Sequence, residues 1–114
     1  MKNDDQDPIR AHRYDHTDIR PSTFDDPEYP FMFIGDVAGD NSYLFELQEG
    51  RVDNHFIAKK MQELCAVGEG VMLDEEACLL YAFFKTQHIG IEFLKKLSAW
   101  LSQKARLLER AKEY

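Results

Sequence analysis

The sequence has no hydrophobic run long enough to cross a membrane. Its longest uninterrupted apolar stretch, residues 77–84, is far shorter than the roughly 20 residues that a transmembrane helix needs. The opening segment, MKNDDQDPIR, is acidic and polar and lacks the apolar core of a signal peptide. We therefore predict a cytoplasmic protein that makes no membrane contact.

Basic residues are also scarce. The chain has 14 Lys and Arg against 21 Asp and Glu, for a formal net charge of -7. Nonspecific binding to nucleic acid or to an anionic membrane needs a basic surface, so the charge disfavours both. Residues 1–54 hold thirteen Asp or Glu against five Lys or Arg, whereas residues 55–114 are nearly balanced. The acidic front half is suited to a basic partner protein.

Cysteine is rare, and catalytic motifs are missing. Cys65 and Cys78 have no metal-site spacing and lie among apolar residues. We therefore predict two buried free thiols in a reducing compartment, with a disulfide as the alternative. The sequence has no glycine-rich phosphate loop and no serine in a nucleophile-elbow pattern, and a thiol on an apolar face is inert even if His88 lies near it. We predict no enzyme and no cofactor.

The first part of the chain is predicted to be an irregular acidic arm, residues 1–29, in front of a single α+β domain, residues 30–114. The arm contains three prolines and no sustained helical or strand period. Its isolated apolar side chains are typical of a chain that lies across a surface, and Tyr14, Phe24 and Tyr29 are candidate contacts with a partner. The alternative is a disordered tail.

Two strands are predicted after the arm. Residues 31–34 are a run of strand formers, and in residues 41–47 the side chains of Tyr43, Phe45 and Leu47 would share one face. Residues 35–40 tolerate turn dihedral angles, so we predict a β-hairpin, with a brief third strand at residues 51–52.

Three helices are predicted to follow. The first begins at Asp53 or Asn54 and ends at Gly68, and the second spans residues 74–85 and is apolar on nearly every side. The third is amphipathic and begins after a break at Gly90. The predicted fold class is α+β: a small β-hairpin or three-stranded meander packed on two to three helices, with a long C-terminal amphipathic helix.

The end of the last helix provides further candidate contacts. Its apolar side chains recur every seven residues, and its final turns have no evident cover within the chain. We therefore predict a homodimer. The candidate partner-binding residues of this helix are Trp100, Leu101, Lys104, Leu107, Leu108 and Ala111.

One group of residues resembles a set of metal ligands. His12, Asp15, His16 and Asp18 lie close together in the sequence, and histidines four apart on a helix can share a metal ion. The arm does not have a helical pattern, and no third ligand group is evident elsewhere. We predict no metal site, and the alternative of metal binding by this group stays open.

These observations favour a non-catalytic protein that acts by protein–protein interaction. An inhibitor or immunity-type protein that neutralises a basic target is one option within that class. The alternative is a DNA-binding regulator that uses the basic outer face of the last helix, although the net charge makes nucleic acid the less favoured partner.

Overall fold

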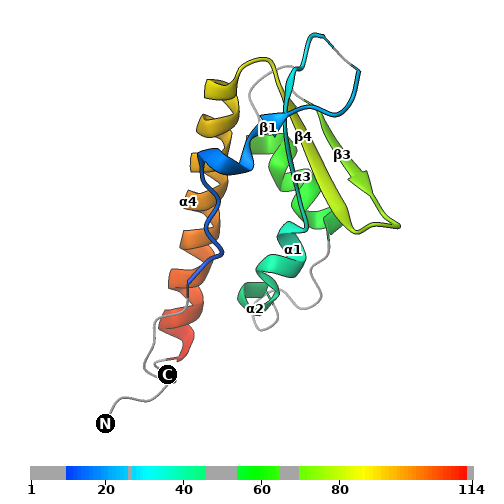
Figure 1. Cartoon of the computed structure of the whole chain (residues 1–114). Coiled ribbons are helices and arrows are strands. Elements are labelled where there is room, and N and C mark those ends of the chain that lie inside the picture. Colours follow the sequence, from blue (N-terminus) through cyan, green and yellow to red (C-terminus); the bar gives the residue numbers. More distant parts are fainter. Residues whose placement is uncertain (1–9, 26, 46–53, 65–69, 113–114) are drawn as a thin grey trace.

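The structure, a computed structural model, describes residues 10–25, 27–45, 54–64 and 70–112 (Figure 1). The predicted α+β fold with a long C-terminal helix is confirmed. The strands are β1 (Arg20–Pro21), β2 (Phe31–Gly35), β3 (Val71–Asp74) and β4 (Leu79–Phe84). The helices are α1 (Val37–Asp40), α2 (Ser42–Phe45), α3 (Asn54–Leu64) and α4 (Gln87–Lys112), with a short 3-10 helix, η2 (His16–Asp18).

The four strands form one antiparallel sheet in the order β1-β2-β4-β3. The central pair is β2 with β4, in a register that places Phe31 opposite Phe84 and Gly35 opposite Leu80. Strands β3 and β4 form a hairpin whose turn is residues 75–78. Strand β2 therefore pairs with a strand far along the chain and not with the segment that follows it.

The predicted hairpin is wrong in its second strand. Residues 31–34 do lie in β2, but residues 42–45 of the other predicted strand form helix α2. Residues 46 and 47, and the third strand predicted at residues 51–52, lie outside the described residues.

Two side chains explain the helical path after β2. Asp36 caps α1, because its carboxylate accepts a hydrogen bond from the Gly39 N–H at 2.8 Å. The fully buried Asn41 then donates its side-chain amide to the Val37 carbonyl oxygen at 2.9 Å. These bonds satisfy the backbone locally, so the segment does not need a strand partner.

The helix predicted at residues 74–85 is also wrong, because this segment is the β3–β4 hairpin. Asp74, expected to cap a helix, holds the hairpin turn by accepting the Ala77 N–H at 3.1 Å. Cys78 closes the turn with a left-handed φ of 57°. Strand β4 has apolar side chains on both faces, and such a strand has the same sequence pattern as a buried helix.

The other two helices lie close to their predicted places. The predicted start of the first helix is confirmed, since α3 begins at Asn54, while its predicted end at Gly68 lies outside the described residues. Helix α4 begins at Gln87, so Gly90 is inside its first turn and does not break it. Gly90 is buried where the helix meets Ile19 and Phe84, and a Cβ there would be 3.0 Å from an atom of each side chain.

The core lies between one face of the sheet and the helices (Figure 1). Phe33, Leu80, Ala82 and Phe84 point from the sheet into it and are almost completely buried. Facing them are Ile57 and Met61 of α3 and four apolar residues of α4, namely Phe93, Leu94, Leu97 and Leu101. Among the described residues, no helix combines the length and the apolar character that crossing a membrane requires.

The N-terminal segment runs beside α4 before it enters the sheet as β1 (Figure 1). Hydrogen bonds to the α1–α2 region hold it there: the His12 N–H donates to the Asn41 side-chain oxygen at 2.8 Å, and the Tyr43 hydroxyl donates to the Arg10 carbonyl. Further on, Ile19 is buried in the core. Part of the predicted arm thus packs against the domain.

Candidate interaction surface

The face of the sheet away from the helices is apolar. Side chains alternate along β4, so Leu79, Tyr81 and Phe83 point to the side opposite Leu80 and Ala82. The strand register adds Ile34 beside Tyr81 on β2 and Met72 beside Tyr81 on β3. We call this surface the open sheet face and define it as Phe24, Ile34, Met72, Leu79, Tyr81 and Phe83. An antiparallel sheet with one solvated face normally has polar residues on that face.

Phe24 packs across this surface from the loop between β1 and β2. Its ring centroid lies 5.6 Å from that of Tyr81 and 5.2 Å from that of Phe83, both in edge-to-face geometry. The Phe24 N–H donates to the Ser22 hydroxyl at 3.0 Å, and the neighbouring Thr23 N–H donates to the Met32 sulfur at 3.4 Å. The loop is therefore fastened to the sheet, and the aromatic rings are held in fixed positions.

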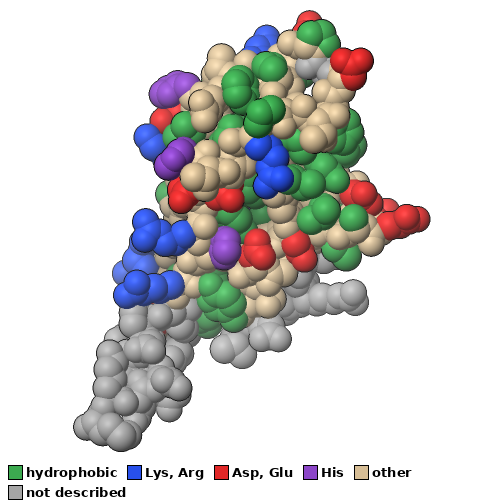
Figure 2. All heavy atoms as spheres, viewed as in Figure 1, with side chains coloured by type: hydrophobic (Ala, Val, Ile, Leu, Met, Phe, Trp, Pro, Cys, Tyr) green, Lys and Arg blue, Asp and Glu red, His purple; other side chains and the backbone are tan. Residues whose placement is uncertain are grey.

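The open sheet face is accessible to a partner. Phe24 retains 44% of its surface and Met72 retains 39%, while Leu79, Tyr81 and Phe83 are half-buried. None of the six side chains belongs to the packed core, and no helix among the described residues covers them. Figure 2 shows hydrophobic side chains gathered beside the strands, at the right of the view. Contiguous exposed apolar surface of this kind marks interaction sites in soluble proteins.

Acidic side chains border this surface at the end of the β3–β4 hairpin. Glu75 and Glu76 are exposed in the turn, and Asp74 lies on the same side of β3 as Met72. Figure 2 shows Asp and Glu side chains at the tip of the hairpin. The border therefore places negative charge at one edge of an apolar patch.

The residues predicted at the end of α4 divide into two groups. Leu101 and Leu108 are core residues with 0% and 3% exposure, so the expectation that Leu108 lacks cover within the chain is wrong. Leu107, which is next to Leu108 in the chain and points about a quarter-turn away from it, is 44% exposed. The side chain of Ala111 lies outside the described part of the chain.

Trp100 and Lys104 form a second aromatic cluster with α3. The Lys60 and Lys104 ammonium groups lie 5.6 Å and 5.9 Å from the centroid of the half-buried Trp100 ring, within reach of cation–π attraction. The Phe56 ring centroid lies 6.3 Å from that of Trp100. This cluster ties α3 to α4 and leaves Phe56 41% exposed.

The aromatic residues predicted in the arm have different roles. Only Phe24 lies on the open sheet face, and Tyr29 is half-buried nearby in the chain. Tyr14 packs edge-to-face on Phe33 at 5.4 Å, and its hydroxyl donates to Asp40 at 2.9 Å. Burial, followed by the charge of Asp40, raises the pKa of Tyr14 far above its usual value. Tyr14 is therefore an internal contact of the domain.

The residues of the potential metal group bind each other and the backbone. Asp15 and Asp18 form a capping box around η2, in which the Asp15 carboxylate accepts the Thr17 N–H and the Asp18 carboxylate accepts the Asp15 N–H. His12 packs beside Tyr14, with 4.6 Å between ring centroids. Within the described ranges, no three His, Cys, Asp or Glu side chains come together in a way that could hold a metal ion.

Cys78 is exposed, which corrects the prediction of a buried thiol, while Cys65 lies outside the described residues. Cys78 shares a cavity of about 350 Å³ with His55, which makes a 2.5 Å contact from its Nε2 to the Glu75 carboxylate. Sequence patterns do not predict this neighbourhood, because His55 lies on α3 and Cys78 lies in the hairpin turn.

The open sheet face is the site that the sequence patterns missed. The aromatic residues Tyr81, Phe83 and Phe84 favour a strand, but they lie in a continuous apolar run that also fits a buried helix. No protein family, curated protein or solved structure matches this chain.

Proposed function

We propose that this protein acts by binding another protein through the open sheet face and that it is not an enzyme. The observation that carries the proposal is the aromatic cluster of Phe24, Tyr81 and Phe83, which is fixed in place and partly exposed. Aromatic side chains that are rigid before binding lose little conformational freedom on association, and they dominate the energetics of many interfaces.

The acidic border supports a partner of basic character. Asp74, Glu75 and Glu76 adjoin the apolar surface, and complementary charge would speed and orient association. An inhibitor or immunity-type protein that neutralises a basic target fits this arrangement. A cytoplasmic location fits the free, exposed thiol of Cys78, because reducing compartments preserve such thiols.

The proposal is tested by affinity capture from the native organism, followed by direct binding measurements on the captured protein. The test variant is Phe24→Ser combined with Met72→Glu, and the matched control is Leu107→Ser, which removes an equally exposed apolar side chain elsewhere. We expect the test variant to lose the partner and the control to retain it, and both to stay folded. The test variant should lose some thermal stability, because Phe24 packs on Tyr81 and Phe83. Equal capture by the wild type and the test variant would contradict the proposal.

A second copy of the chain is the first partner to examine. Strand β3 forms an edge of the sheet and carries the exposed Met72, so two copies could pair along β3 and continue the open sheet face. We therefore keep the predicted homodimer as a proposal and place it at this edge. Light scattering on the wild type and on Met72→Lys tests it: a monomer mass for the wild type contradicts the homodimer.

Duplex DNA remains a second candidate partner, because α4 exposes Lys95, Lys96, Arg106 and Arg110. Figure 2 shows Lys and Arg side chains gathered at the lower left of the view, where the later turns of α4 lie. A regulator that binds DNA with these residues would lose affinity steeply as salt is added. Titration with duplex DNA at two salt concentrations tests this function, and the absence of binding at low salt contradicts it.

A further inference from the structure

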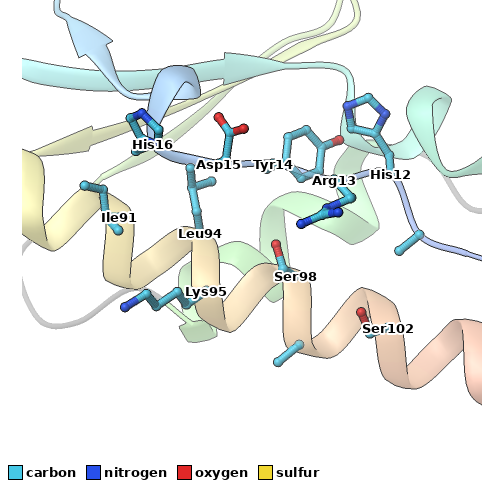
Figure 3. A pocket seen from close by; sticks show the side chains of 12 residues that line it. His12, Arg13, Tyr14, Asp15, His16, Ile91, Leu94, Lys95, Ser98 and Ser102 are labelled. Atoms are coloured by element: carbon cyan, nitrogen blue, oxygen red, sulfur yellow. The ribbon is translucent and has the colours of Figure 1, made fainter.

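A groove lies between the N-terminal segment and α4, on a part of the molecule separate from the open sheet face (Figure 3). Its main part has a volume of about 560 Å³, and a smaller part of about 290 Å³ continues it toward the end of α4. The two parts share Ala11, Arg13 and Ser102 in their walls. We call this feature the arm groove. The volume of its main part is in the range of small-molecule sites.

The groove exists because the segment is held at a distance from small side chains. The wall provided by α4 contains Ala99, Ser102 and Ala105, which do not reach far from the helix. The anchors of the segment are the hydrogen bonds of Arg10, His12 and Tyr14 to the α1–α2 region, already described. Contacts within the chain therefore hold both walls of the groove in place, as expected for a preformed site.

The charge of the groove is opposite to that of the whole protein. Arg10, Arg13 and Arg106 line it, and none of the three forms an ion pair among the described residues. The fourth cation, Lys95, is paired with Glu92 at 3.0 Å. Among the described residues, Asp15 is the one carboxylate in the walls, and it accepts hydrogen bonds from the Thr17 N–H and hydroxyl. These bonds lower the pKa of Asp15, and the charges of His16 and Arg13 add to the effect, so Arg13 lies within electrostatic reach of this carboxylate. Three guanidinium groups that form no ion pair with a described residue thus line the groove and could bind an anion.

A buried hydroxyl adds a second, independent observation. Ser98 Oγ is buried and has no hydrogen-bond partner, and it is the one buried side-chain polar atom in this condition among the described residues. Figure 3 shows the Ser98 hydroxyl pointing from α4 toward the N-terminal segment and the Arg13 side chain extending from that segment toward α4. A buried hydroxyl without a partner is costly. The Ser98 Oγ has almost no accessible surface, so an oxygen-bearing ligand would reach it only after the Ser98 side chain turns toward the groove that it lines.

The other end of the main part has apolar surface from the half-buried Ile91, next to the core residue Leu94, and the polar side chains of Asp15, His16 and Lys95 border it. A ligand with a hydrocarbon or aromatic body could place that body against Ile91. Arginine forks recognise planar carboxylates and phosphates with paired hydrogen bonds. We infer that the arm groove binds a small organic oxyanion, a phosphate ester or a carboxylate, with the acid group near Arg13 and Ser98 and an apolar body near Ile91 and Leu94.

The test uses the full chain and four probes: phenyl phosphate, benzoate, inorganic phosphate and benzyl alcohol. Amide chemical shifts are followed by NMR during each titration. We expect saturable shifts in residues 11–14 and 98–102 with phenyl phosphate, benzoate or both, and much weaker effects with inorganic phosphate and benzyl alcohol. The two aromatic anions distinguish phosphate from carboxylate. Absence of saturable shifts at millimolar concentrations of both anions overturns the inference.

Two variants and a matched control make the test specific. Arg13→Gln should weaken binding about tenfold or more, because it removes a charged hydrogen-bond donor. Lys96→Gln removes an equally exposed cation of α4 that does not line the groove, and it should leave affinity nearly unchanged. Equal weakening by both variants would indicate nonspecific attraction and overturn the inference. Displacement of phenyl phosphate by duplex DNA would also overturn it in favour of a nucleic-acid surface.

Ser98→Ala separates a ligand contact from a structural role. Because the hydroxyl has no partner in the folded chain, its removal should not lower the thermal stability of the free protein. It should weaken phenyl phosphate or benzoate binding several-fold. If Ser98→Ala lowers the thermal stability of the protein but leaves its affinity for both anions unchanged, the hydroxyl stabilises the fold and does not contact the ligand. The inference does not depend on the protein-binding proposal, since Phe24 and Met72 lie outside the groove.

Discussion

The side-chain amide of Asn54 donates to the Cys78 carbonyl oxygen at 3.0 Å, and this bond joins the start of α3 to the β3–β4 turn. Asn54 is almost fully buried, and its oxygen also accepts the Ala38 N–H at 3.1 Å. Asn54→Ala would leave two backbone groups without partners. We expect a loss of about 2 to 4 kcal/mol in the free energy of unfolding, measured by urea denaturation. A loss near zero would mean that water replaces both bonds.

Gly90→Ala should lower stability, although alanine normally stabilises a helix relative to glycine by about 1 kcal/mol. The added Cβ would come 3.0 Å from Ile19 Cδ1 and 3.0 Å from Phe84 Cδ2, both in the core. We expect a net loss of about 1 to 3 kcal/mol, measured by thermal denaturation. Gly70→Ala is the control, because its Cβ would meet no atom within 4 Å. A stabilised Gly90→Ala protein would contradict the close packing.

Leu107 and Leu108 provide a matched pair at the end of α4. Leu108→Asp places a charge in the core and should cost about 3 kcal/mol or more. Leu107→Asp alters an exposed position and should cost only about 1 kcal/mol, mainly because aspartate is a poor helix former and its charge opposes the helix dipole. Thermal denaturation of both variants checks the expectation. Similar melting temperatures for the two variants would contradict the finding that Leu108 faces the core and Leu107 faces solvent.

Stability should fall at alkaline pH because of Tyr14. Its folded-state pKa is raised by burial and by Asp40, so the folded protein keeps a phenolic proton that the unfolded chain releases above about pH 10. The Tyr14 contribution is complete below that pH and is lost as the pH rises further. We expect Tyr14→Phe to be less stable by about 1 kcal/mol at neutral pH, through loss of the Asp40 bond, but to show a smaller alkaline decline. Urea midpoints measured from neutral to alkaline pH test the difference in slope.

The two longer helices of the structure were predictable because their apolar residues recur at helical spacing. In α3, Ile57 and Met61 are one turn apart and both fully buried, and in α4 the same holds for Leu97 and Leu101. Each helix has one buried stripe and one polar side, so local periodicity carries enough information to identify it.

The sheet was harder to predict because β4 is apolar on both faces for two different reasons. Leu80 and Ala82 are buried in the core, whereas Tyr81 and Phe83 form the open sheet face. A strand of this kind loses the alternation that distinguishes it from a buried helix, so residues 77–84 were predicted as helical. The surface proposed to bind a partner and the failed prediction therefore have the same physical cause.

The arm groove could not be predicted from sequence patterns at all. Arg13 and Ser98 are far apart in the chain, and they line the same groove because Asn41 and Asp40 hold the N-terminal segment beside α4. Local periodicity contains no information about such a contact. The isolated apolar side chains of the arm predict a segment that lies across a surface, and one of them, Phe24, does lie on the open sheet face.

The pairing of Phe31 with Phe84 has a consequence for synthesis of the chain. Strand β2 leaves the ribosome long before its central partner, and closing so large a loop is slow compared with forming the local β3–β4 hairpin. The hairpin is therefore expected to form first and to serve as the template on which β2 docks. Until residue 84 has emerged, the nascent N-terminal half exposes Met32 and Phe33 without a sheet to bury them, which makes that interval the point of greatest exposure to chaperones and aggregation.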